Sequence, residues 1–176
     1  MISVDFDSTL NNLLEAWVYY INKEEKPSKL YTIQDIIKWD DKILHRNKEF
    51  IKNRLLYKKV KVLIGAKEFI KELRKLDEVQ IVSITPNYHI EPKMEFIKKH
   101  FGSVPIIFME KDKYKFTKSS LLIDDNLNNL EEHQKYNNGK CIVFSNKEKY
   151  VYNRTNKFVR LGNYTDIIKY IKNNII

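Results

Sequence analysis

Two aspartates one residue apart, Asp5 and Asp7, are the residues of this sequence best placed to do chemistry. They follow the short apolar run at residues 2–4, and a Ser-Thr pair comes next. Such a run predicts a buried strand of an α/β sheet, and these sheets bind ligands beyond the carboxyl ends of their strands. Taken alone, the motif also fits a strand followed by an Asx-rich turn. Two carboxylates at a strand exit are costly to bury unless a metal ion or a cationic ligand compensates their charge.

Two later segments also end an apolar run in polar groups. Each is a short strand-like stretch, and each places a hydroxyl or acidic group at the predicted strand exit. One such exit is ordinary, but an ordered set of them is specific. The segments are residues 79–82, followed by Ser83 and Thr85, and residues 121–123, followed by Asp124 and Asp125.

A group of lysines, at positions 111, 113, 115 and 118, lies just before the last of these strands. In chain order the sequence therefore reads Asp-x-Asp, Ser/Thr, Lys and Asp-Asp. This order resembles the haloacid dehalogenase superfamily of aspartate-nucleophile phosphotransferases, which place these groups in the same succession after their strands. A response-regulator receiver carries similar groups, but its acidic pair comes near the start and its lysine last. The order here excludes that class.

Four longer motifs narrow the resemblance to the 5′(3′)-deoxyribonucleotidases, which are the cytosolic type C 5′-nucleotidases. This family has many short bacterial and bacteriophage members, and the similarity spans most of the chain, from Ile2 to about Asn153. The motifs are residues 5–10, residues 31–40, Asp112-Lys113 before residues 121–125, and residues 142–144 followed by Tyr152-Asn153-Arg154.

The resemblance assigns the chemistry of the site. It implies that Asp5 attacks phosphorus and forms an aspartyl-phosphate, while Asp7 protonates the leaving oxygen and later activates water. It also implies a bound Mg²⁺ ion, which prefers hard oxygen ligands. The implied ligands are the Asp5 carboxylate, the Asp7 backbone carbonyl and the Asp124-Asp125 pair. We expect Asp125 to be the direct ligand and Asp124 to lie behind it, with the reverse assignment left open.

The groups that would hold the phosphate have alternatives in the sequence. Ser83 is favoured as the hydroxyl that bonds a phosphoryl oxygen, and Thr85 is its competitor. Lys113 follows the Asp-Lys pattern of the family. Lys115 is the alternative, because the spacing from Lys113 to Leu121 is about one residue longer than usual.

Four aromatic residues are candidates for contacts with a nucleobase, namely Phe6, Trp17, Tyr20 and Trp39. Trp17 also has helical spacing with apolar neighbours, which is more typical of a core residue. Ser8 occupies a position where relatives often carry glycine, so the floor of the substrate pocket is expected to differ from theirs.

The elements between these motifs predict an α/β fold, a Rossmann-like doubly wound parallel sheet. The core is expected to span residues 1–9 and 60–176, with a small helical cap at residues 10–59 inserted after the first strand. Caps of this kind exclude water and contact the part of the substrate that is not phosphate. Core helices are expected over residues 66–76, from Pro92 to a stop at Gly102, and after a cap at Thr165.

The composition is that of one soluble globular domain, with 176 residues, 43% hydrophobic and 31% charged. No apolar run approaches the roughly 20 residues of a membrane span, and Met1 leads directly into the first strand, which indicates a cytoplasmic protein. Cys141 is the only cysteine, so no disulfide forms within the chain. The net charge of +9 suits an anionic partner. Because the lysines are spread over every predicted helix, small phosphate substrates are favoured over nucleic acid.

The leading hypothesis is therefore a Mg²⁺-dependent phosphatase that acts on a small-molecule nucleotide, a deoxyribonucleoside monophosphate. One alternative keeps the chemistry but changes the substrate to another small phosphoester or to a nucleic-acid 3′ end. An alternative of another class is a catalytically silent binding protein on the same fold, against which the intact set of site residues argues. The sequence leaves the base, the sugar, the 5′ or 3′ preference and the formation of a homodimer open.

Overall fold

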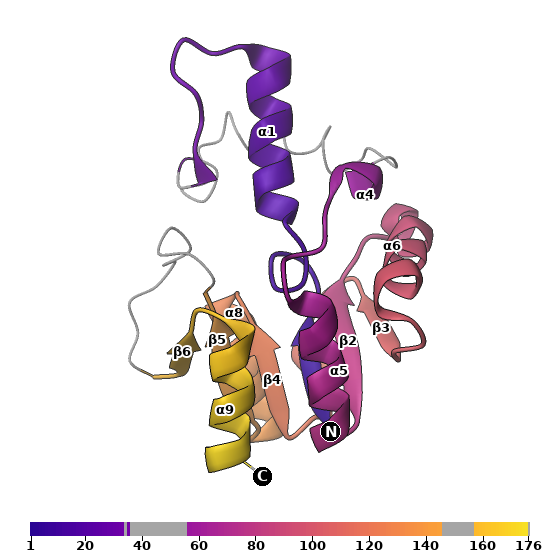
Figure 1. Cartoon of the computed structure of the whole chain (residues 1–176), viewed down its shortest axis with the longest axis vertical. Helices are drawn as coiled ribbons and strands as arrows, with labels where there is room; N and C mark the ends of the chain where they lie inside the picture. Colours follow the sequence, from indigo (N-terminus) through magenta and orange to yellow (C-terminus); the bar gives the residue numbers. More distant parts are fainter. Residues whose placement is uncertain (34, 36–55, 146–156, 176) are drawn as a thin grey trace.

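The structure is a computed structural model, and it describes residues 1–33, 35, 56–145 and 157–175 of the chain. Its centre is a six-stranded parallel sheet in the order β3-β2-β1-β4-β5-β6 (Figure 1). This order confirms the predicted doubly wound sheet, because the chain winds outward in both directions from its middle. The strands are β1 (Ile2–Asp5), β2 (Val79–Ile84), β3 (Ile106–Met109), β4 (Leu121–Asp124), β5 (Lys140–Phe144) and β6 (Val159–Leu161).

The central strands are apolar along most of their length because helices cover both faces of the sheet. Ile2, Val4, Ile81 and Ile123 are each no more than 1% exposed. α5 (Ala66–Leu76) and α9 (Tyr164–Asn174) contact each other in front of the sheet in the view of Figure 1, while α8 lies behind it. The remaining core helices are α6 (Asn87–Phe101), which contacts α5, and α7 (Lys113–Phe116), which contacts α8 (Leu127–Asn137).

Two helix boundaries differ from the sequence expectation. α6 does not begin at Pro92 but at Asn87, directly after Pro86, and Pro92 lies inside the helix. Pro86 has the extended backbone of a residue that precedes a helix, and it can start the helix without losing a hydrogen bond. The last helix is capped by Asn163 rather than Thr165, because the Asn163 side chain accepts a hydrogen bond from the Asp166 amide.

The segment inserted after β1 rises beyond the carboxyl ends of the strands, where α1 (Leu13–Glu25) and α4 (Leu56–Lys59) lie (Figure 1). Its two ends are tied together. The Asn12 amide donates to the Lys61 carbonyl at 3.0 Å, and the Leu63 amide donates to the Leu10 carbonyl at 3.0 Å. Trp39 and the Tyr152-Asn153-Arg154 motif lie outside the described residues.

The register of the sheet brings the polar strand exits together. Asp5 pairs with Val82, so Ser83 is the next residue on β2, and Val4 pairs with Ile123, so Asp124 is the next residue on β4. The strands that follow β1 in the sequence, β2 and β3, lie on one side of it, whereas β4 lies on its other side and is followed outward by β5 and β6. The boundary between β1 and β4 is therefore a topological switch point, which is where open α/β sheets bind ligands. No helix in the described part of the chain has the length and apolar content that a membrane crossing needs.

Candidate active site

The Asp-x-Asp motif directs two carboxylates to one side of the chain and an aromatic anchor to the other, since side chains alternate along extended backbone. Phe6 is fully buried and packs edge-on against Phe96, with ring centroids 5.7 Å apart. Asp5 and Asp7 instead face a cavity of about 350 Å³. The packing of Phe6 therefore fixes the position of the two aspartates that flank it.

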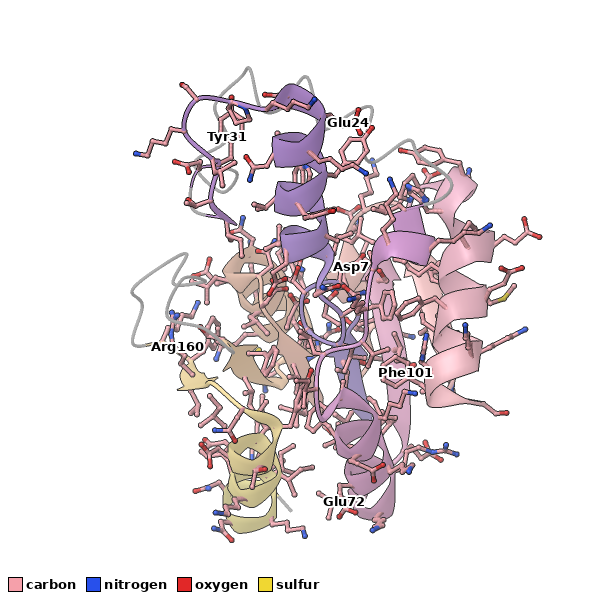
Figure 2. All side chains as sticks on the ribbon, turned by 45° about the horizontal axis from the view of Figure 1, so that its top comes forward. Asp7, Glu24, Tyr31, Glu72, Phe101 and Arg160 are labelled. Atoms are coloured by element: carbon pink, nitrogen blue, oxygen red, sulfur yellow. The ribbon has the colours of Figure 1, made fainter. Side chains whose placement is uncertain are left out.

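The cavity lies at the carboxyl edge of the sheet. Figure 2 shows Asp7 between α1 and the strands below it. The wall has an apolar part, formed by Leu14, Ile84 and Leu127. The polar lining combines groups at the exits of the central strands with Lys113 from α7 and two asparagines from α8. Its members are Asp5, Asp7, Ser8, Ser83, Lys113, Asp124, Asp125, Asn126, Asn128 and Asn129.

A buried lysine bridges two of the carboxylates on the cavity floor. Lys113, which is 1% exposed, donates to Asp5 Oδ1 in a short contact and to Asp124 Oδ2 at 2.7 Å. Burial lowers the pKa of Lys113, but the charges of Asp124 and Asp5 outweigh it and raise that pKa above its ordinary value. The ammonium is therefore charged, and it links the predicted nucleophile to the paired acids.

The charge of Asp5 is nevertheless poorly compensated. Burial raises the pKa of Asp5 to about 7, and the charges of Asp124 and Asp7 add to this rise against the opposing effect of Lys113. Burial and the charges of Asp5 and Asp124 also raise the pKa of Asp125 well above its usual range. Among the described residues, Asp5, Asp124 and Asp7 each form an ion pair with a lysine, and Asp125 forms none.

Three carboxylates of this floor fit a metal ion. One oxygen from each of Asp5, Asp124 and Asp125 lies within 4.8 Å of the others. All of these donors are hard oxygens, and the charge of a divalent cation would offset the burial and the repulsion that raise the pKa values of Asp5 and Asp125. Asp124 is already occupied by other donors, because its carboxylate accepts hydrogen bonds from Lys113, from the Asn126 amide at 2.8 Å and from Asn129 Nδ2 at 3.0 Å.

Three residues that the sequence reasoning missed surround Asp7. Asn11 Nδ2 donates to Asp7 Oδ1 at 3.1 Å, and the Tyr57 hydroxyl donates to the same oxygen at 3.1 Å. Lys93 Nζ donates to Asp7 Oδ2 at 2.7 Å. Burial and the charge of Asp7 raise the pKa of Tyr57 well above its ordinary value, so Tyr57 is a hydrogen-bond donor here.

The candidates for phosphate binding separate in the structure. Ser83 lines the cavity, whereas Thr85 is buried behind it with its hydroxyl 3.2 Å from Ser83 Oγ. Lys113 contacts Asp5, whereas Lys115 is exposed and pairs with Asp112 at 2.6 Å. The structure thus brings Ser83 and Lys113 to the cavity, and it leaves Thr85 and Lys115 outside its lining.

Of the described aromatic candidates, Phe6 and Trp17 belong to the hydrophobic core and Tyr20 packs against it, partly buried. Phe6 and Trp17 are 0% and 5% exposed, and neither lines the cavity beside Asp5. Their contact with a nucleobase stays a prediction, as does that of Trp39. Ser8 does line the cavity, and it adopts a φ of 62°, a backbone conformation that favours glycine.

A comparison with protein families finds one whose model matches residues 1–174 and is described as 5′ nucleotidase, deoxy (pyrimidine), cytosolic type C protein. Two similar curated proteins are 5′(3′)-deoxyribonucleotidases, one from Bacillus subtilis (strain 168) and one from Bacillus phage SPbeta. Each is 29% identical to this chain over 177 residues, which cover 95% of both proteins.

Solved structures support the fold at much lower sequence identity. L-2-haloacid dehalogenase from Xanthobacter autotrophicus superposes with a TM-score of 0.67 at 7% identity, over 99% of this chain and 98% of that one. A haloacid dehalogenase-like hydrolase from Streptococcus pneumoniae gives a TM-score of 0.63 at 11% identity, over 97% of each chain.

Proposed function

Because the chain belongs to the cytosolic type C 5′-nucleotidase family of the haloacid dehalogenase superfamily, and is thus a phosphoric monoester hydrolase, we propose that it hydrolyses deoxyribonucleoside monophosphates. The products are a nucleoside and inorganic phosphate. The observation that carries this proposal is the group of Asp5, Lys113 and Asp125 on the floor of one cavity, with Asp7 at its side. The family description, which names a cytosolic nucleotidase, also supports a cytoplasmic location and a small-molecule substrate.

We assign the two chemical steps to Asp5 and Asp7. In the first step an Asp5 oxygen bonds to phosphorus while the ester P–O bond breaks, and Asp7 gives its proton to the departing oxygen. In the second step a water molecule attacks phosphorus, gives a proton back to Asp7 and releases Asp5. These steps leave both aspartates as they began, so no other reactant is needed.

Lys113 and Ser83 would bind the phosphoryl group. Phosphoryl transfer depends mainly on position and on charge compensation around the phosphoryl oxygens. The Lys113 ammonium contacts Asp5 directly, so a phosphate placed for attack by Asp5 would lie beside that positive charge. Ser83 would donate its hydroxyl proton to a phosphoryl oxygen from the neighbouring strand.

Mg²⁺ is the metal that we infer for the carboxylate floor. The Asp5 carboxylate, the Asp7 backbone carbonyl and the Asp125 carboxylate would hold it, with Asp124 kept in place by Lys113, Asn126 and Asn129. When bound, the ion would supply positive charge to the phosphoryl oxygens. Neither a cysteine pair nor a paired-histidine motif is present in the sequence, so zinc-type ligation is unsupported.

The size of the cavity favours a mononucleotide over a polymer. At about 350 Å³ it is comparable to pockets that enclose small ligands. Its apolar wall of Leu14, Ile84 and Leu127 suits the nucleoside part of the substrate. Leu14 belongs to the inserted segment, so we propose that residues 10–59 form a cap that contacts the nucleoside, whereas residues 1–9 and 60–176 form the core that binds phosphate.

A panel of phosphate esters tests this function. Phosphate release would be measured with Mg²⁺ for 5′- and 3′-deoxyribonucleoside monophosphates, ribonucleoside monophosphates, p-nitrophenyl phosphate and a 3′-phosphorylated oligonucleotide. We expect the deoxyribonucleotides to give the highest kcat/KM, and exhaustive EDTA treatment to remove the activity. A preference for the oligonucleotide or for a non-nucleotide ester would overturn the substrate assignment. Absence of hydrolysis with every ester would favour a silent binding protein.

A further inference from the structure

A second buried lysine, Lys93 on α6, lies in the candidate site without lining its cavity. Its side chain is 2% exposed, and its Nζ lies 2.7 Å from Asp7 Oδ2, 2.8 Å from Ser83 Oγ and 2.8 Å from Thr85 Oγ1. A lysine ammonium has three hydrogen-bond donors and no acceptor. These contacts engage all three donors, so Lys93 is not a free cation available to a phosphate.

The contacts of Lys93 determine the direction of the Ser83 hydroxyl proton. Because an ammonium only donates, Ser83 Oγ and Thr85 Oγ1 both accept from Lys93. The one proton of the Thr85 hydroxyl is directed at Ser83, with Ser83 Oγ at 3.2 Å and the Ser83 carbonyl at 3.4 Å. This arrangement leaves the Ser83 proton for the cavity, and Ser83 is the hydroxyl of this pair that lines the cavity.

The same ammonium fixes the Asp7 carboxylate. Lys93 holds Asp7 Oδ2, while Asn11 and Tyr57 hold Oδ1 at 3.1 Å each. The rings of Phe6 and Tyr57 flank the ammonium, with centroids 5.6 and 5.4 Å from Nζ. This enclosure leaves the Asp7 side chain 22% exposed, and Asp7 faces the cavity.

We propose that Lys93 is a positioning residue that orients the proton of Ser83 toward the phosphate and the carboxylate of Asp7 toward the leaving oxygen. This inference rests on the proposed phosphatase function, but it concerns groups that Lys113 does not contact. Lys113 binds Asp5 and Asp124, whereas Lys93 binds the proton carrier and the hydroxyl. One cation thus couples the placement of two groups that act at opposite ends of the breaking bond.

The test compares two esters that differ in their need for a proton. The aryl oxide of p-nitrophenyl phosphate leaves without protonation, whereas the alkoxide of a nucleoside monophosphate requires it. Single-turnover release of the leaving alcohol reports the first step alone, which separates it from the hydrolysis of the intermediate that both esters share. For Lys93→Met we expect this rate on the nucleotide to fall about 10²-fold, since a small misplacement of a catalytic group has that effect. On the aryl ester we expect the loss to be no larger than that of Ser83→Ala, and the Lys93→Met, Ser83→Ala double variant to lose no more than either single variant.

Controls separate positioning from binding and from folding. Lys98→Met changes an exposed lysine of the same helix and is expected to leave both activities unchanged. Equal losses of the single-turnover rate on both esters for Lys93→Met, or a rise in KM alone, would overturn the positioning role. If Lys93→Met fails to fold, Thr85→Val removes one contact of Lys93 without a change in charge, and it must then show a loss that is larger on the nucleotide. A wild type that hydrolyses neither ester would overturn the proposed function and this inference with it.

Discussion

Two buried lysines divide the carboxylates of the site between them. Lys113 contacts Asp5 and Asp124, and Lys93 contacts Asp7. Asp125 has no lysine partner among the described residues, and its pKa is raised well above the usual range by burial and by its acidic neighbours. Its charge is therefore the one that a metal ion would most directly stabilise.

Asp125→Asn should separate metal binding from folding. Without metal we expect the variant to be at least as stable as the wild type, because the substitution removes a repelled negative charge. With Mg²⁺ at about 100 times its Kd, the wild type should gain about 2.7 kcal/mol, or roughly 5–10 °C in Tm, and the variant should gain much less. Thermal unfolding with and without Mg²⁺ measures both effects.

Glu78→Gln is the matched control for this change, since Glu78 is an exposed acid that precedes β2 at the amino end of the strands. It should keep the full gain in Tm. An Asp125→Asn variant that responds to Mg²⁺ as the wild type does would refute the assignment of Asp125 as a ligand.

Ser8→Gly should stabilise the protein, because Ser8 has a φ of 62° and glycine reaches that region without a steric penalty. The expected gain is up to about 1 kcal/mol, less the extra entropy that glycine loses on folding. Ser8→Ala keeps the strain and removes the hydroxyl, so it should give no gain. Lys26→Gly tests the same effect at φ 45°, at the end of α1. Urea midpoints measure all three variants, and a Ser8→Gly protein less stable than Ser8→Ala would count against strain.

At the scale of elements, the strand exits were predictable and the surroundings of Asp7 were not. A short apolar run that stops at a polar group marks the carboxyl end of a buried strand, which is why Asp5, Ser83 and Asp124 could be found. Tyr57 reaches Asp7 from a segment 50 residues further along the chain, and no local pattern in the sequence records such a contact. Asn11 lies four residues after Asp7 in the same turn, where its hydrogen bond to Asp7 is a local one.

The helical spacing of Lys93 could have marked it as buried, but the incorrect start predicted for α6 concealed that spacing. With α6 beginning at Asn87, Lys93 shares the buried face with His89, Phe96 and Ile97 at helical spacing. A lysine at the centre of a buried helix face is costly without partners, so it indicates a polar site beneath it. With the start placed at Pro92, Lys93 falls in the first turn, where a lysine is typical of solvent-exposed surface.

The inserted segment offers a comparison between its two tryptophans. Trp17 on α1 is 5% exposed within the core, so Trp17→Ala should lower the free energy of unfolding by roughly 3–5 kcal/mol. We predict that Trp39→Ala instead raises KM for nucleotides much more than for p-nitrophenyl phosphate, because stacking on a base contributes roughly 1–3 kcal/mol to binding. Steady-state kinetics on both esters and urea unfolding of both variants provide the measurements. Equal changes in KM on both esters for Trp39→Ala would mean that it does not contact the base.

At the scale of the whole molecule, the fold brings segments from distant parts of the chain to one edge of the sheet. Asp5, Ser83, Lys113 and Asp125 are spread over about two thirds of the sequence, yet all four line one cavity. The parallel order of β2, β1 and β4 causes this, because it aligns the carboxyl ends of strands that are remote in sequence.

The most direct test of the mechanism is the capture of a phosphorylated Asp5. Borohydride reduces an acyl phosphate to an alcohol, which converts a phosphorylated aspartate into homoserine that mass spectrometry locates in the chain. During turnover of a deoxyribonucleoside monophosphate with Mg²⁺, homoserine is expected at position 5 only. More of it is expected in Asp7→Asn supplied with p-nitrophenyl phosphate, because that leaving group needs no proton from Asp7 and the variant hydrolyses the intermediate slowly. Asp5→Asn should give neither homoserine nor turnover. Continued turnover with an unmodified Asp5, or homoserine at position 7, would contradict the assignment of Asp5 as the nucleophile.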